Sequence, residues 1–379
     1  MGTKYTATNQ PFPPYCWNMR KMLGLICIAS VILSGCTDHR SIIIGFSNPE
    51  IEYWGRVDTS STESAELYWS GTSIKINFEG TSIQALLKDE SGDNYFNIIL
   101  DQDSVSLLRP DTIKQYYQLA SQLPGGAHSI EIFKRTEWDR GKTDFYGFKI
   151  NSRARLLEKP APRKRRMEFY GNSITAGYAV EDTSGRDSPD STFTNNYLSY
   201  SAITARHYDA EYQCICKSGI GITISWFPLI MPEIYDRLNP ADPSSKWDFK
   251  MYDPDIVVIN LFQNDSWLVN MPDREEFKMN FGTKAPGDEY FINAYQQFVA
   301  SIRNEYPEAN IICALGSMDA ARKGSKWIGY IEQAVSNLND QSVFTHFIPY
   351  KETPGHPSIS EQQQMANSLI SFIDDHIDW

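Results

Sequence analysis

The chain has 379 residues, enough for about two domains, and its 41% hydrophobic residues are sufficient for a packed core. A formal net charge of −12 argues against non-specific nucleic-acid binding, because contact with phosphates needs a basic face. We therefore expect no nucleic acid as a partner. The 9 Trp, 21 Tyr and 19 Phe residues suit a sugar or another small organic ligand, and packing in a large core is the alternative for any one of them.

The N-terminal segment has the pattern of an export signal. Two basic residues, Arg20 and Lys21, precede an apolar stretch over residues 22–34 that is too short to span a bilayer comfortably. Residues 1–18 contain three prolines and do not resemble a signal, so we expect translation to begin at Met19.

The apolar stretch is followed by Leu-Ser-Gly-Cys ending at Cys36, which resembles a bacterial lipobox. The resemblance implies that residues 1–35 are a signal peptide and that Cys36 carries a lipid after cleavage. We therefore expect an exported bacterial lipoprotein, tethered to a membrane in the periplasm or at the cell surface. An ordinary secretory signal with a cysteine there by chance is the alternative.

Residues 41–155 are predicted to form an antiparallel β-sandwich. Short segments alternate apolar and polar residues at a period of two, and turn-rich breaks such as Ser-Gly-Asp-Asn separate them. The segments are "AELYWSG", "SIKINFEG", "TSIQALLKD", "NYFNIILDQ" and "HSIEIFKRT". Several short strands at this spacing are typical of sandwiches. Residues 156–166 carry two prolines and a basic cluster, which indicate a solvated linker.

Residues 167–379 change to an α/β pattern. Short apolar runs are expected as strands, namely "RMEFYG", "YQCICKSG", "DIVVINLF", "NIICALG" and "VFTHFIP". Helices are expected over 195–207, 288–305, 326–337 and 358–377. Alternating strands and helices predict a parallel sheet covered on both faces. Cys214 and Cys216 alternate within one such strand, so we expect buried thiols on the same side. The sequence has no CxxC pair or His-rich cluster, and we expect neither a metal nor a cofactor.

Four of these strands are each followed by a residue that could take part in catalysis: Ser173, Gly219, Asn264 and His356. Ligands of open parallel sheets bind at the carboxyl ends of the strands. A hydroxyl, an imidazole, a backbone N–H and a side-chain amide are the groups that ester hydrolysis by nucleophilic attack requires. Each also has a structural role open to it: Ser173 as a helix N-cap, Gly219 and Asn264 in turns, and His356 in a loop.

The four blocks "GNSIT", "SGIG", "QND" and "GHPS" resemble those of the SGNH hydrolases, also called GDSL-type esterases. The segments "YWGRVD", "YWSGTSIKINFEGTSI" and "NYFNIILD" resemble the N-terminal sandwich of carbohydrate esterase family two. The resemblance implies a flavodoxin-like three-layer domain preceded by a jelly-roll-like sandwich. It also implies removal of acetyl groups from polysaccharides or oligosaccharides.

By this resemblance, Ser173 is the nucleophile and His356 is the base. The N–H groups of Ser173 and Gly219 and the amide of Asn264 form the oxyanion hole. The family pattern is not complete, because position 172 is Asn instead of Asp, which can still accept a local hydrogen bond. Phe262 stands where the family usually has glycine, and we expect this bulky aromatic to narrow or reshape the site.

The usual acid lies three residues before the histidine, and that position is Thr353. We therefore expect a Ser-His dyad whose imidazole is held by a backbone carbonyl or by Thr353, with adjacent Glu352 as an alternative. Aromatic residues near the blocks are candidates for stacking against sugar rings: Tyr178, Trp226, Phe262 and Trp267.

The expected function is that of a lipid-anchored serine esterase that deacetylates polysaccharides through an acyl-enzyme. One alternative is a general carboxylesterase or lipase-like enzyme of the same fold. Another is a non-catalytic sugar-binding lipoprotein, which the missing acid and Phe262 favour.

Overall fold

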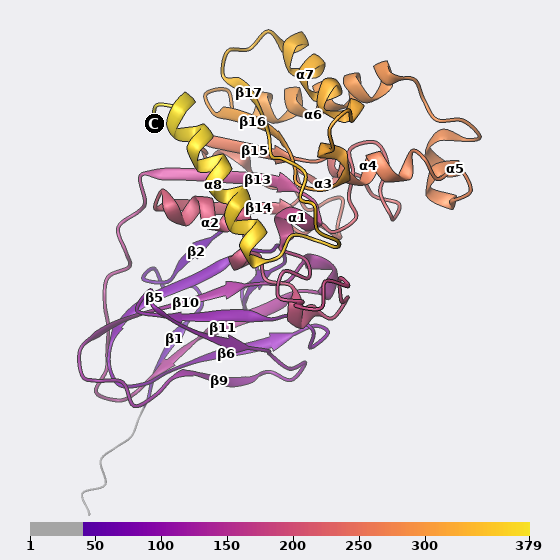
Figure 1. The fold of residues 1–379 in the computed structure, drawn as a ribbon. Helices are drawn as coiled ribbons and strands as arrows, with labels where there is room; N and C mark the ends of the chain where they lie inside the picture. Colours follow the sequence, from indigo (N-terminus) through magenta and orange to yellow (C-terminus); the bar gives the residue numbers. More distant parts are fainter. Residues whose placement is uncertain (1–40) are drawn as a thin grey trace, which may run out of the picture. The chain divides into compact units, whose positions relative to one another are not determined.

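The computed structural model describes residues 41–379, so Cys36 and the expected signal peptide lie outside the described residues. The chain forms an antiparallel β-sandwich followed by a parallel sheet with helices on both faces (Figure 1), as predicted. Within residues 41–379, no helix combines the length and apolarity needed to cross a membrane.

The sandwich consists of two antiparallel sheets of six strands each. The first has the order β3-β4-β11-β6-β9, with β1 paired to β11. Its strands are β3 (Val57–Asp58), β4 (Ala65–Leu67), β11 (Thr143–Ile150), β6 (Ile83–Asp89), β9 (Gln115–Ala120) and β1 (Ile42–Gly45). The second has the order β12-β5-β10-β7-β8, with β2 paired to β5. Its strands are β12 (Arg155–Leu156), β5 (Ser73–Glu79), β10 (Ala127–Lys134), β7 (Phe96–Leu100), β8 (Ser104–Leu108) and β2 (Glu52–Trp54).

The period of two predicted five of these strands correctly. Ile74, Ile76 and Phe78 of β5 point into the sandwich core, where Phe145 and Phe148 of β11 also lie. The sequence did not identify β11, although this strand pairs with three others. Its register shifts between Phe145 and Gly147, and this bulge interrupts the alternation that identifies a strand.

The segment expected as a linker is shorter than predicted and is not simply solvated. β12 ends at Leu156, and the first strand of the parallel sheet already begins at Arg165. Arg165 and Arg166 already belong to this strand: Arg166 pairs with Glu211 at 3.4 Å, and Arg165 donates to the carbonyl of Trp379 at 3.0 Å. Within the shortened segment, Arg163 pairs with Asp209 of the α/β half.

The parallel sheet has the strand order β14-β13-β15-β16-β17. Its strands are β13 (Arg165–Gly171), β14 (Ala210–Cys216), β15 (Ile256–Asn260), β16 (Asn310–Leu315) and β17 (Val343–Phe347). This is the flavodoxin-like order 2-1-3-4-5, as expected, and its strand order reverses between β13 and β15. The carboxyl ends of β14, β13 and β15, which precede Gly219, Ser173 and Asn264, are therefore neighbours.

Four helices cover the two faces of this sheet (Figure 1). α2 (Tyr200–His207) and α8 (Ile359–His376) pack on one face, and α6 (Asp288–Glu305) and α7 (Lys326–Leu338) on the other. α2 begins five residues later than expected, because Ser199 caps it by accepting a hydrogen bond from Ala202 N. Four shorter helices complete the domain. α1 (Ser173–Ala176) precedes α2, and α3 (Met231–Ile234), α4 (Gln263–Leu268) and α5 (Glu275–Phe281) lie between α2 and α6.

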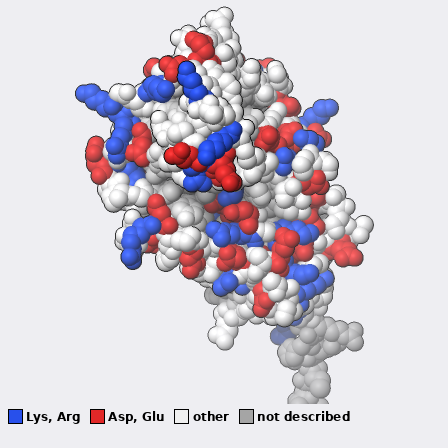
Figure 2. Space-filling view, turned by 90° about the vertical axis from the view of Figure 1, so that its right-hand side faces the viewer, with Lys and Arg blue, Asp and Glu red and all other residues white. Residues whose placement is uncertain are grey.

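The thiols of Cys214 and Cys216 are buried on the same side of β14, as predicted, with sulfur atoms 3.3 Å apart. Charges on the surface are mixed, and acidic and basic side chains are interspersed on the face in Figure 2.

The sandwich and the α/β half are joined by a buried ion pair. The Arg56 guanidinium, at the start of the sandwich, reaches Glu168 of β13 at 2.8 Å, and the two side chains are 1% and 0% exposed. Arg56 also donates to the hydroxyl of Tyr170 at 3.2 Å and to the carbonyl of Tyr235 at 2.5 Å. Ile99 and Phe133 of the sandwich belong to the same apolar cluster as β14 and α8. The two halves therefore share a core.

Replacing Arg56 with Met should lower the free energy of unfolding by about 3–5 kcal/mol, because Glu168 would remain buried without its cation. Urea denaturation measures this loss. The matched control is Arg155→Met, which removes an exposed ion pair with Glu79 and should change stability little. Equal unfolding midpoints for the two variants would show that the buried pair does not anchor the halves.

Candidate active site

Ser173 stands directly after the first strand of the parallel sheet, at the start of α1. Asn172 caps this helix, since its side-chain oxygen accepts a hydrogen bond from Ile174 N at 3.0 Å. The Asn in place of the family's Asp thus makes the local hydrogen bond that we predicted. Ser173 is the first helical residue and not the N-cap, and it is 6% exposed. Its hydroxyl is therefore free for another partner.

That partner is His356, whose Nε2 lies 2.8 Å from the Ser173 oxygen. His356 belongs to the loop between β17 and α8. The buried Gln362 fixes the start of α8 to α1 and α2. Its side chain donates to the carbonyl of Ile174 at 2.9 Å and accepts from Tyr200 N at 2.7 Å. The loop thus holds an imidazole against a hydroxyl, which is the arrangement of a nucleophile and its base.

The group that faces the other ring nitrogen is Asp187, which the sequence analysis did not identify. One carboxylate oxygen lies 2.9 Å from His356 Nδ1, and the other accepts the backbone N–H of His356 at 2.7 Å. The contact at Nδ1 is an ion pair when the imidazole is protonated. Partial burial raises the pKa of Asp187, but the hydrogen bonds from His356 outweigh this effect and hold the pKa below its usual value.

The expected orienting residues therefore need correction. The Thr353 hydroxyl donates to Glu361 and accepts from Lys351 at 2.9 Å, so it is occupied away from the imidazole. Glu352 is exposed. The expected dyad, with a carbonyl or Thr353 as orienter, is replaced by a Ser173–His356–Asp187 arrangement.

The close approach of Asp187 depends on a glycine next to the histidine. Gly355 has a φ of +72°, and a Cβ on it would lie 2.8 Å from a carboxylate oxygen of Asp187. Asp187 itself has a φ of 57°, a left-handed conformation that Asp tolerates better than most residues. The loop sequence "GRDSPD" is rich in such turn residues, which was the available but weak signal for this position.

The three residues expected to form the oxyanion hole lie in the segments that follow three neighbouring strands. Among residues 41–379, no hydrogen bond uses the N–H of Ser173 or of Gly219, so both are available to a ligand. Gly219 has a φ of 85°, which favours glycine there. The Asn264 amide donates one proton to the carbonyl of Ile220 at 2.8 Å, and its second proton has no partner among these hydrogen bonds.

A buried carboxylate ties the Gly219 loop to the Asn264 helix. Asp265 accepts hydrogen bonds from the backbone N–H groups of Ile222, Thr223 and Ile224, and from the Thr223 hydroxyl at 2.7 Å. Burial raises the pKa of Asp265, and these donors oppose the rise. Asp265 thus holds the two segments together.

The sandwich also contributes to this edge. The Glu137 carboxylate accepts the N–H and the hydroxyl of Ser218, directly before Gly219. The Asp139 carboxylate pairs with Lys217 at 2.9 Å. No pattern in the sequence predicted these contacts between the sandwich and the α/β half.

The four aromatic candidates have different surroundings. The Tyr178 ring meets the His356 ring edge-on at 4.9 Å. Trp226 donates its indole N–H to Asn264 at 3.0 Å, and Trp267 donates to Asp319 at 3.0 Å. All three are half-buried, and a role for them in sugar stacking stays a prediction.

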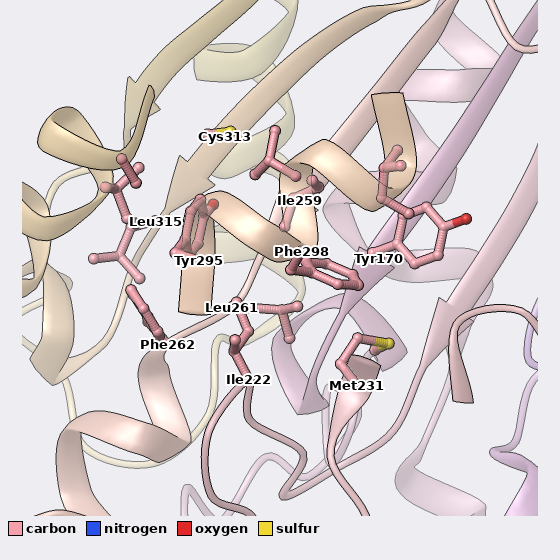
Figure 3. Packing of buried hydrophobic residues seen from close by; sticks show 14 of the residues in the cluster. Tyr170, Ile222, Met231, Ile259, Leu261, Phe262, Tyr295, Phe298, Cys313 and Leu315 are labelled. Carbon is pink, nitrogen blue, oxygen red and sulfur yellow. The ribbon is translucent and has the colours of Figure 1, made fainter. Parts of the chain in front are cut away.

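Phe262 is not a site residue, contrary to expectation. Its side chain is 0% exposed and packs 4.8 Å from the Tyr295 ring and 4.9 Å from the Trp327 ring, inside the core (Figure 3). Its φ of 81° explains why glycine suits this position. The phenyl ring is buried in the core, so it does not narrow the site.

Fold and site together define a serine hydrolase of the SGNH type. The family model described as "Carbohydrate esterase 2 N-terminal" matches residues 53–160. A family two carbohydrate esterase from Clostridium thermocellum, solved with cellohexaose, is 32% identical with a TM-score of 0.77, covering 86% of this chain and 98% of that one. The chain therefore belongs to carbohydrate esterase family two.

Two curated relatives extend this comparison. Cellulase/esterase CelE of Acetivibrio thermocellus is 34% identical over 88% of this chain, which spans only 40% of that protein's length. An acetylxylan esterase / glucomannan deacetylase of Cellvibrio japonicus is 24% identical over 94% of this chain and 98% of its own length. Within residues 41–379, no three His, Cys, Asp or Glu side chains are grouped to hold a metal ion.

Replacing Asp187 with Asn should lower kcat about a hundred- to ten-thousand-fold with little change in KM, because the imidazolium would lose its counter-charge. Steady-state kinetics on an acetyl ester measure this. Thr353→Val and Glu352→Gln are the controls and should retain nearly the full rate. A large loss in either control, with Asp187→Asn unaffected, would restore the original assignment.

Because the folded pKa of Asp187 is lowered, its contribution to stability should be present at neutral pH and disappear as the pH falls through that pKa.

Proposed function

We propose that the protein is a serine esterase that removes O-acetyl groups from polysaccharides or their oligosaccharides. The observation that carries the proposal is the 2.8 Å contact between the Ser173 hydroxyl and His356 Nε2 at the carboxyl edge of the sheet. Membership of carbohydrate esterase family two supports the substrate class.

In the acylation step, the Ser173 oxygen attacks the acetyl carbonyl carbon while His356 Nε2 takes the hydroxyl proton. The carbonyl oxygen becomes an oxyanion, which accepts hydrogen bonds from Ser173 N, Gly219 N and the free amide proton of Asn264. The tetrahedral intermediate collapses when the bond to the sugar oxygen breaks. His356 returns its proton to that oxygen, and the acetyl group stays on Ser173.

In the deacylation step, His356 takes a proton from a water molecule that attacks the acetyl-serine. The second tetrahedral intermediate uses the same oxyanion donors and releases acetate, and the proton returns to the Ser173 oxygen. Asp187 stabilises the imidazolium in both steps, because its carboxylate lies 2.9 Å from Nδ1.

The rival functions differ in substrate and in chemistry. A general carboxylesterase or lipase-like enzyme would prefer p-nitrophenyl esters of longer acyl chains to acetylated glycans. The alternative of a non-catalytic sugar-binding lipoprotein was based on the missing acid and on Phe262. Asp187 supplies a carboxylate and Phe262 lies in the core, so neither feature now favours it.

The wild type should release acetate from one or more members of a panel of acetylated xylan, glucomannan and their oligosaccharides, and Ser173→Ala should release none. Acetate assay of both proteins measures this. Labelling with an active-site serine reagent supplies the second readout, because only the wild type should be modified. Full activity in Ser173→Ala would place the chemistry elsewhere.

For localisation, we propose an exported lipoprotein held at a membrane by a lipid on Cys36. The lipobox-like sequence before Cys36 supports this. The full chain expressed in a bacterial host should partition with membranes and incorporate labelled fatty acid, whereas Cys36→Ser should do neither. Equal labelling of both proteins would exclude Cys36 as the acceptor.

A further inference from the structure

Trp226 makes a hydrogen bond that the ester chemistry described above does not use directly. Its indole Nε1–H donates to the side-chain oxygen of Asn264 at 3.0 Å. The amide nitrogen of Asn264 donates to the carbonyl of Ile220 at 2.8 Å. The two ends of the same amide are thus held by a donor and an acceptor from the loop that follows β14.

These two contacts decide which end of the Asn264 amide can face an oxyanion. If the amide turned over, its nitrogen would meet the Trp226 N–H and its oxygen would meet the Ile220 carbonyl. Both hydrogen bonds would become repulsive contacts between like partners. Within the site, a turned amide would also present an oxygen where a proton donor is needed.

Trp226 is itself held firmly in this position. Its backbone N–H donates to the carbonyl of Gly219 at 3.0 Å, and a Cβ added to Gly219 would lie 3.3 Å from Trp226 Cβ. The Arg274 guanidinium lies 4.7 Å from the centre of the indole ring. A cation against the ring draws electron density from it and makes the N–H a stronger donor.

From this geometry we propose that Trp226 is a positioning residue, which fixes and polarises the Asn264 amide as an oxyanion donor. A hydrogen bond accepted by the amide oxygen strengthens the remaining N–H as a donor. The indole therefore acts through Asn264 and does not touch the reacting atoms. The proposal rests on the proposed esterase function, and it assigns to Trp226 a role other than sugar stacking.

A double-mutant cycle between Trp226→Phe and Asn264→Ala tests the proposal, with p-nitrophenyl acetate as the substrate so that sugar contacts play no part. Asn264→Ala should lower kcat about a hundred- to thousand-fold. Trp226→Phe should lower kcat roughly tenfold with KM nearly unchanged, because the ring stays but the donor is lost. In the Asn264→Ala background, Trp226→Phe should add less than about a twofold loss.

A matched control is Trp247→Phe, because the indole nitrogen of Trp247 has no hydrogen-bond partner among the described residues. This variant should keep the wild-type kcat. If Trp226→Phe unfolds, a benzothiophene analogue of tryptophan at position 226 keeps the ring size and removes only the N–H, and it should show the same loss.

Three outcomes would overturn the proposal: an unchanged kcat in Trp226→Phe, the same loss in both backgrounds, or a rise in KM alone. The last would make Trp226 a binding residue. An Asn264→Ala variant with normal kcat is a different failure, because it would remove Asn264 from the oxyanion hole and overturn that part of the proposed function.

Discussion

The carboxylate of Asp265 makes the contacts on which the geometry of the site depends. It is fully buried and gathers three consecutive backbone N–H groups of the loop after β14. Gly219 and Trp226 belong to the same loop, and Asn264 is the residue before Asp265. One side chain therefore sets the spacing between the Gly219 N–H and the Asn264 amide, which are the donors of the proposed oxyanion hole and follow different strands. Electrostatic stabilisation of this kind requires donors that are already in place when charge develops.

The strand order explains why these segments meet at all. Reversal of the order between β13 and β15 brings the ends of β14, β13 and β15 together, and the loop after β17 then places His356 over Ser173. The sandwich completes the arrangement through Glu137 at Ser218. The proposed catalytic groups thus follow strands of a parallel sheet, whereas part of their support comes from the antiparallel sandwich.

Much of this could be predicted from sequence because it depends on local pattern. α6 has the predicted bounds, and Ser173 and His356 follow strands that their apolar runs identified. Asp187 could not be found in this way, because it lies 169 residues from His356 in a loop without periodicity. Phe262 was misassigned for a related reason. Its place beside the QND block suggested the cleft, but a positive φ turns the ring inward, and single-residue backbone conformation is not visible in an apolar pattern.

The shared core of the two halves has a consequence for how such a protein changes over evolutionary time. Arg56 and Arg135 of the sandwich are both buried within the α/β half, where Arg135 donates to the carbonyl of Thr194 at 3.2 Å. If the halves were separated, these cations would lose the partners that they contact in the α/β half. Recombination should therefore move the two halves together, with fusion points outside them.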